Sequence, residues 1–162
     1  MHVPRARQFT LSITENLFKE AKKMSVKQIS VFIENKKGRI ATLSKILAEN
    51  SIDMCALSLA DTTDFGILRI LVDKPDEAKK VLRENGFVVK TTEVVAISME
   101  NVPGGLAKIL SKLEEGGVGI EYMYAFVGAK SHEAFGVLKV DDEAKTAEIL
   151  AKMGIEPLEE IK

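Results

Sequence analysis

One segment of this chain occurs twice. Residues 34–41 read ENKKGRIA and residues 100–107 read ENVPGGLA, an offset of 66 residues. Each copy follows an apolar, strand-like run and opens a helix-like one. A repeat of this kind predicts two copies of one supersecondary unit. A chain of 162 residues that is 46% hydrophobic and 29% charged has the composition of a globular protein and the length for two small domains.

Along the first copy, the spacing of apolar residues switches between the period typical of a strand and the period typical of a helix. Apolar residues alternate in the strand-like runs, and they recur every three or four residues in the helix-like ones. Asp73 is the expected N-cap of the second helix, and Asn85-Gly86 is its expected end. The expected elements are strands at 28–33, 52–60, 67–72 and 87–90 and helices at 38–49 and 74–85.

The second copy repeats this order. Its expected strands are 94–99, 118–127, 134–140 and 155–158, and its expected helices are 104–115 and 143–153. Strand, helix, strand, strand, helix, strand is the split βαβ pattern. The predicted fold class is therefore α+β: two ferredoxin-like βαββαβ units in tandem, with antiparallel sheets and helices on one face. We expect domains at 25–92 and 93–162, after a leader at 1–24 that is disordered or non-native, with a short packed helix or a functional segment as alternatives.

The strand pattern leaves the second face of each sheet apolar. The residues expected under the helices are Leu68, Ile70, Val72, Leu138 and Val140. Tyr122, Tyr124 and Phe126 are expected on the open face of the second copy. Because a unit of this size buries little surface alone, we expect the copies to pack together and the chain to form a homodimer.

Composition argues against several classes of function. A net charge of -1 gives no electrostatic footprint for nucleic acid or for a membrane surface, and no apolar run is long enough to span a bilayer. The single Cys55 excludes an internal disulfide framework and suits a cytoplasmic protein. His2 and His132 are the only histidines, so the sequence offers no metal cluster and no histidine-based catalytic dyad. We expect no cofactor and no enzymatic activity.

The repeated turn is the place where a ligand is most readily expected. Each copy has a glycine at the start of a helix, where unpaired backbone N–H groups and the helix dipole favour an anion. Asn35 and Asn101 are able either to cap the helix or to hold the polar head of a ligand. From the residues alone, a plain helix cap and a site for a small carboxylate remain equal alternatives.

The run Asn-Val-Pro-Gly-Gly-Leu at 101–106 resembles the ACT domain, the split βαβ regulatory module of amino-acid metabolism. The run at 35–40 matches it except that Lys37 replaces proline and Ile40 replaces leucine. The resemblance covers 24–162, both copies, and is similar to the stand-alone tandem ACT proteins that carry no attached enzyme.

The resemblance implies an amino-acid ligand at an interface between paired modules, held by the turn and by the start of the second strand. The implied ligand-binding residues are Asn35, Lys37, Gly38, Arg39, Asp53, Asn101, Pro103, Gly104 and Gly105. We expect the first-copy site to be the stronger one, because Asp53 offers an acceptor for an ammonium group where the second copy has Gly119. The second site is expected to be empty or to bind through backbone alone. Lys37 and Arg39 are interpreted mainly as solvated side chains, and alternatively as partners of a carboxylate.

The resulting hypothesis is a non-enzymatic sensor that binds an amino acid or related carboxylate and signals its occupancy to a partner. A dissociable regulatory subunit of an amino-acid biosynthetic enzyme is the alternative, by comparison with the small subunit of acetolactate synthase. A purely structural dimerisation module and an unrecognised enzyme are the remaining alternatives.

Overall fold

The computed structural model describes residues 25–61, 64–127 and 132–159, which form two compact units. We call Val26–Val94 the first module and Val95–Glu159 the second module. The expected leader, residues 1–24, lies outside the described residues. The domain limits drawn from the sequence, 25–92 and 93–162, remain a prediction.

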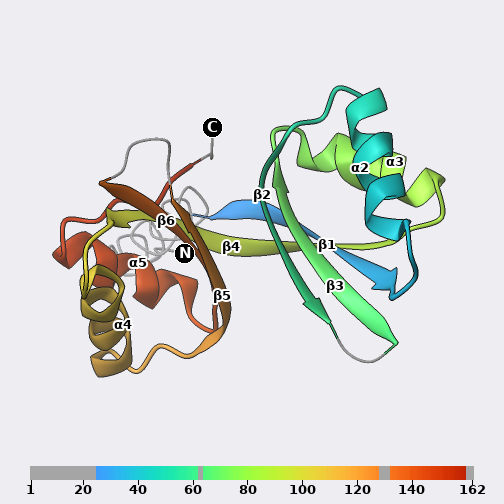
Figure 1. Ribbon diagram of the computed structural model, residues 1–162. Helices are drawn as coiled ribbons and strands as arrows, with labels where there is room; N and C mark the ends of the chain where they lie inside the picture. Colours follow the sequence, from blue (N-terminus) through green and yellow to red (C-terminus); the bar gives the residue numbers. More distant parts are fainter. Residues whose placement is uncertain (1–24, 62–63, 128–131, 160–162) are drawn as a thin grey trace, which may run out of the picture. The chain divides into compact units, whose positions relative to one another are not determined.

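The first module has the βαββαβ order (Figure 1). Its elements are β1 (Val26–Glu34), α2 (Arg39–Glu49), β2 (Met54–Asp61), β3 (Phe65–Val72), α3 (Pro75–Glu84) and the first part of β4 (Val88–Glu100). The strands are ordered β2-β3-β1-β4, and all neighbours are antiparallel. The two helices lie together on one face of this sheet, where their apolar sides form the module's core.

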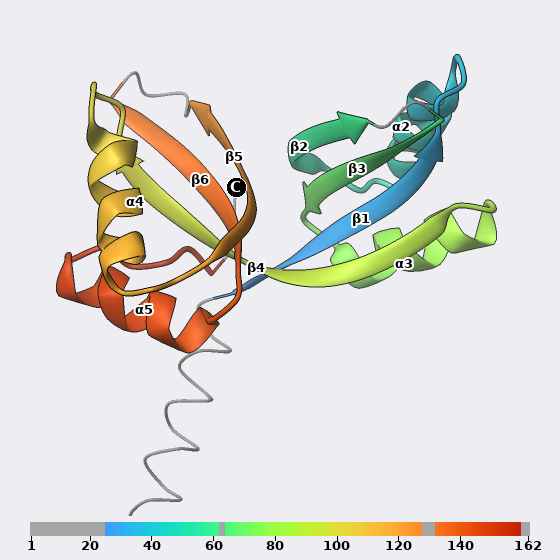
Figure 2. The ribbon, with the colours of Figure 1, turned by 90° about the horizontal axis from the view of Figure 1, so that it is seen from below.

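The second module repeats the arrangement with the rest of β4 (Figure 2). Its further elements are α4 (Gly105–Glu115), β5 (Ile120–Val127), β6 (Glu133–Val140) and α5 (Glu143–Lys152). The strand order is β4-β6-β5, again antiparallel, with both helices on one face. The predicted fold class is thereby confirmed.

The predicted strand register is also confirmed. Leu68, Ile70, Leu138 and Val140 are at most 2% exposed. Val72 is half-buried and packs against the same core as Leu68. A register shifted by one residue would have turned all of these side chains to the other face.

The expectation of two separate strands on either side of the boundary between the copies is wrong. We expected separate strands at 87–90 and 94–99, whereas β4 is one strand that pairs with β1 over 88–94 and with β6 over 95–100. The polar residues Thr91, Thr92 and Glu93 lie between the two expected strands. Threonine is β-branched and favours the extended backbone. Because β1 runs alongside Thr91 and Thr92 and pairs with them, these polar residues continue the strand.

The strand expected at 155–158 is reduced to a single bridge. Ile97 pairs with Pro157, and the N–H of Leu158 donates to the carbonyl of Ala96 at 2.7 Å. Proline has no N–H to donate, so Pro157 interrupts the ladder that a fourth strand would need. In the first module, the corresponding strand β1 stays paired with β4 as far as Phe32, which lies opposite Val88. In the second module, β4 has no such partner strand beside Ser98, on the side away from β6, among the described residues.

Candidate functional site

The repeated turn has the same backbone geometry in both modules. Gly38, the N-cap of α2, has φ 84° and ψ -9°, and Gly104, the N-cap of α4, has φ 88° and ψ -10°. Only glycine adopts this left-handed conformation without strain. Since glycine has no side chain, neither cap supplies a side-chain acceptor to the N–H groups of the first helical turn.

The two asparagines anchor their turns in the same way. The N–H of Asn35 donates to the carbonyl of Asp64, and the N–H of Asn101 donates to the carbonyl of His132, both at 3.0 Å. Asp64 directly precedes β3, and His132 directly precedes β6. Each turn is therefore fixed against the loop that leads into the third strand of its module, and both asparagine residues are exposed.

The charged residues of the first turn have different surroundings. Lys36 forms an ion pair with Glu34 at 2.9 Å, and its hydrogen bond and charge hold the pKa of Glu34 below the usual range. Lys37 is exposed. The guanidinium of Arg39 lies 4.5 Å from the ring centroid of the buried Phe87. The interpretation of Arg39 as a solvated side chain is wrong, because its charge is stacked on an aromatic face.

Asp53 and Gly119 occupy equivalent positions at the start of the second strand of each module. The N–H of Asp53 donates to the Asp73 carboxylate at 2.9 Å, and the N–H of Gly119 donates to the Asp141 carboxylate at 2.8 Å. Asp73 is therefore not the N-cap of α3, a position that Lys74 occupies. A Cβ atom at Gly119 would lie 2.5 Å from a carboxylate oxygen of Asp141. The N–H of Gly119 already has a partner, which argues against ligand binding through it.

The structure does not bring Asp53 to the Asn35 turn within the first module. Asn35 is bonded to Asp64, just before β3, and Asp53 is bonded to Asp73, just after β3. The strand between them has 8 residues, which at about 3.4 Å per residue separates the two ends by roughly 27 Å. The two charged ends of one small amino acid do not reach both residues of the same module.

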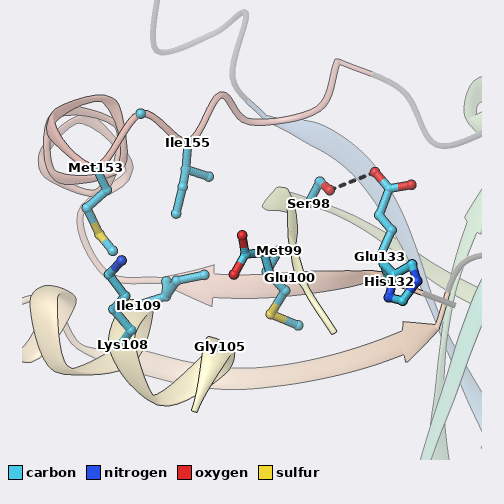
Figure 3. A pocket seen from close by; sticks show the side chains of 11 residues that line it. Ser98, Met99, Glu100, Gly105, Lys108, Ile109, His132, Glu133, Met153 and Ile155 are labelled. Carbon is cyan, nitrogen blue, oxygen red and sulfur yellow. Dashed lines mark hydrogen bonds between the residues drawn. The ribbon is translucent and has the colours of Figure 1, made fainter. Parts of the chain in front are cut away.

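A cavity lies beside the turn in each module. The one in the first module has a volume of only about 50 Å³, and Asn35, Lys36 and Ile40 are among its lining residues. The one in the second module has a volume of about 600 Å³ (Figure 3). The side chains and backbone that line it belong to β4, α4, the start of β6 and the segment after α5: Ser98, Met99, Glu100, Gly105, Lys108, Ile109, His132, Glu133, Met153, Gly154 and Ile155.

The larger cavity combines apolar surface with charges of both signs. Ile109 is 3% exposed, and Met99, Met153 and Ile155 are half-buried. Glu100 and Glu133 are directly opposite each other on β4 and β6, and the hydroxyl of Ser98 donates to Glu133 at 2.9 Å. In Figure 3, Lys108 extends from α4 toward Met153, on the other side of Glu100 from Glu133 and His132.

Sequence reasoning missed most of this cavity. Gly105 was expected in a ligand site, but only as part of the turn. Glu100 was visible as the first residue of the repeated segment, and Lys108 lies one helical turn after Gly105. Nothing in the sequence pattern connects them with Met153 or Ile155, which follow α5.

The described residues carry few signs of other chemistry. Within 25–61, 64–127 and 132–159, no three residues of the types His, Cys, Asp and Glu are grouped so that they could hold a metal ion. Burial raises the pKa of the Cys55 thiol, and the nearby carboxylates Asp53 and Asp73 raise it further, which disfavours the reactive thiolate. Among the helices of this part of the chain, none has the length and apolar character to cross a membrane.

Comparison with known proteins identifies the family. A family model described as an ACT domain pair matches residues 24–161. Among solved structures, protein BT0572 from Bacteroides thetaiotaomicron is 44% identical, with a TM-score of 0.79 over 83% of this chain and 92% of that chain. The regulatory subunit of aspartate kinase from Thermus thermophilus, in its ligand-free form, is 16% identical, with a TM-score of 0.57 over 78% of this chain and 91% of that one. The corresponding subunit from Thermus flavus is 19% identical, with a TM-score of 0.56 over 78% and 92% of the two chains.

None of the curated proteins matches the sequence. The family model nevertheless spans both modules, and the fold, the paired repeat and the Asn-x-Pro-Gly-x-Leu run agree with it. This chain belongs to the ACT domain pair family.

Proposed function

We propose that this protein is a non-enzymatic sensor that binds a small amino acid or a related carboxylate and passes its occupancy to a partner. The observation that carries the proposal is the repeated turn, in which a left-handed glycine at the helix N-terminus is built identically at Gly38 and Gly104. Each turn has a cavity beside it. Backbone N–H groups at a helix N-terminus are suited to a carboxylate.

The proposed contacts come from the turns themselves. In the first module they involve Asn35, Lys37 and Gly38, and in the second module Asn101, Pro103, Gly104 and Gly105. Asp53 is left out of a site within the first module, because it lies at the far end of β3 from the turn. Arg39 is left out because its guanidinium lies on Phe87.

A thermal-shift screen of the full chain against the twenty amino acids tests the sensor proposal. Free ligand at 100 times its dissociation constant stabilises a folded protein by about 2.7 kcal/mol, which is easily seen as a rise in Tm. We expect one amino acid, or a chemically related group of them, to raise the Tm. A screen in which none of the twenty changes the Tm would contradict the proposal.

Calorimetry on two variants tests the contribution of the turns. Asn35→Ala and Asn101→Ala should weaken the binding of the amino acid found in the screen by about 1–3 kcal/mol if the side-chain amide holds a charged group of the ligand. Asn50→Ala is the matched control, because Asn50 lies at the opposite end of α2 and donates to the carbonyl of Ile46 at 2.8 Å. Undiminished affinity in both variants, with an intact fold, would remove the asparagines from the site.

A dissociable regulatory subunit of an amino-acid biosynthetic enzyme is the second candidate. It is favoured by the likeness in fold to two regulatory subunits of aspartate kinase, which this chain matches over 91% and 92% of their length. Affinity purification of the tagged chain from its native cells distinguishes the two functions. A regulatory subunit should bring down a larger enzyme in stoichiometric amount, whereas a sensor of the first kind binds its amino acid without one.

A further inference from the structure

The two modules can be compared position by position after their second helices. The N–H of Phe87 donates to the carbonyl of Leu82 at 3.0 Å, and the N–H of Ile155 donates to the carbonyl of Leu150 at 2.9 Å. Each is preceded by a glycine with positive φ, 82° in the first module and 70° in the second. Ile155 is therefore the counterpart of Phe87.

The first residues of α2 and α4 are counterparts as well. Arg39 follows Gly38, and its N–H donates to the carbonyl of Lys36 at 3.3 Å. Gly105 follows Gly104, and its N–H donates to the carbonyl of Val102 at 3.0 Å. The second module thus has glycine where the first has arginine.

The second module has Gly105 in place of Arg39 and Ile155 in place of Phe87, and these two differences explain why the large cavity lies there. In the first module, the Arg39 guanidinium stacked on the Phe87 ring occupies the space between the start of α2 and the segment after α3. In the second module, that space is bordered by Gly105 and Ile155, which both line the cavity of about 600 Å³. A side chain at 105 is also excluded sterically, because its Cβ would lie 2.5 Å from the carbonyl oxygen of Glu100.

The size and lining of the cavity restrict its occupant. Cavities of about 300–1,000 Å³ with a mainly apolar lining and a few polar groups are typical of small-molecule sites. Here the buried or half-buried part of the lining is apolar, at Ile109, Met153 and Ile155, and the exposed part carries charge, at Glu100 and Lys108. A molecule that carries both charges at one end and a hydrocarbon group at the other fits this lining.

We propose that the cavity of the second module is the site at which this protein binds an apolar α-amino acid, a proposal that rests on the proposed function. Glu100, whose carboxylate points toward the Lys108 side of the cavity, receives the ammonium group (Figure 3). Lys108 pairs with the carboxylate. The side chain of the amino acid lies against Ile109, Met153 and Ile155. In the first module, the positions of Gly105 and Ile155 are held by Arg39 and Phe87, whose side chains contact each other.

Titration calorimetry of the full chain with L-leucine tests the site, and three related probes test its chemistry. 4-Methylpentanoate lacks the ammonium group, 3-methylbutylamine lacks the carboxylate, and L-alanine lacks most of the hydrocarbon. Leucine should bind most tightly of the four. Each buried methylene group is expected to raise the affinity about fourfold, so alanine should bind clearly more weakly than leucine.

Three variants test the location. Ile155→Phe places a ring where the first module has Phe87, and it should weaken leucine binding at least about tenfold by filling the cavity. Lys108→Met and Glu100→Gln each remove one charged partner at the exposed border, and each should weaken binding about threefold or more. Lys112→Met and Glu114→Gln are the matched controls, since both are exposed on α4, outside the lining, and should leave the affinity unchanged.

The outcomes separate this proposal from the proposed function. Loss of leucine affinity in the three cavity variants, with both controls unaffected, supports the site. Leucine binding that is unchanged in Lys108→Met, Glu100→Gln and a folded Ile155→Phe overturns the site and leaves the sensor function standing. Stronger binding of a charged or small polar amino acid than of leucine overturns the apolar selectivity. Absence of binding by every amino acid overturns the proposed function and this proposal together.

Discussion

At the scale of single residues, the two modules share their turn and differ just after it. From the sequence, Gly105 is only an implied ligand-binding residue. Its φ is not among the positive values, so its requirement for glycine is steric. A Cβ atom there would meet the backbone carbonyl of Glu100 at 2.5 Å, and backbone moves less readily than a flexible side chain. This residue therefore sets how closely the start of α4 approaches the end of β4.

Gly105→Ala should destabilise the protein by about 1–3 kcal/mol, because overpacking against backbone forces a shift of the helix start. Alanine would otherwise gain up to about 1 kcal/mol over glycine in a helix, so the two effects have opposite sign. Urea denaturation measures the net change. Ser111→Ala, an exposed position on the same helix, is the control and should stay within about 0.5 kcal/mol. A Gly105→Ala protein that is more stable than the wild type would contradict the close approach of residue 105 to the backbone carbonyl of Glu100.

Arg39→Ala should lower the free energy of unfolding by about 1–2 kcal/mol, since it removes the cation–π contact with Phe87 and the packing of the arginine stem. Lys37→Ala lies in the same turn and is exposed, so it should change stability by less than about 0.5 kcal/mol. Equal effects of the two substitutions in thermal or urea denaturation would show that Arg39 is as solvated as the sequence suggested.

At the scale of helices and strands, the sequence predicted most of the fold, because hydrophobic period is a local property. The alternation around Leu68 and Leu138 fixed the buried face of β3 and β6, and the three-to-four-residue spacing fixed α2 and α4. The errors arose where a partner strand decides the outcome. The polar Thr91 and Thr92 continue β4 because β1 runs alongside them, and Pro157 ends a strand that the apolar pattern had extended.

The caps of the second helices are a difference between the modules that stability measurements can detect. Asp142 caps α5, and its carboxylate accepts from the N–H of Lys145 at 2.9 Å. The N-cap of α3 is Lys74, which makes no side-chain capping hydrogen bond. Asp142→Ala should cost about 0.5–2 kcal/mol, the usual range for loss of an N-cap. Lys145→Ala keeps the donating backbone N–H and is the control, with an expected change below about 0.5 kcal/mol. A cost in Asp142→Ala no larger than in the control would argue that the cap contributes nothing to stability.

At the scale of the whole molecule, duplication preserved the turn and changed what surrounds it. The ligand site expected near the turn rests on the run at 101–106, whose residues are consecutive and so carry the resemblance to the ACT domain. The cavity in the second module could not be predicted in the same way. Gly105 and Ile155 are 50 positions apart in the sequence (155 minus 105). They line the same cavity only because the module folds and packs them together.

The remaining apolar surface bears on self-association. Aromatic side chains of β5 and β6 lie on the face away from the core, where the rings of Phe126 and Phe135 stack with centroids 5.3 Å apart. In the first module β2 is the edge strand, and Leu57 and Leu59 on it are 59% and 47% exposed. Exposed edges and apolar faces of this kind commonly pair with another copy. Both surfaces are candidates for the homodimer that the sequence predicts.

Analytical ultracentrifugation at micromolar concentration should therefore report a dimer or a larger assembly. Tyr124→Glu places a charge on the open face of the second module and should weaken the assembly if that face is the interface, since a charge buried without a partner is costly. Leu57→Glu does the same for the edge strand, and Ser111→Glu adds an identical charge to the exposed side of α4 as a control. Dissociation by one of the two test variants alone identifies its surface as the interface. A wild-type chain that sediments as a monomer would reject self-association through either surface.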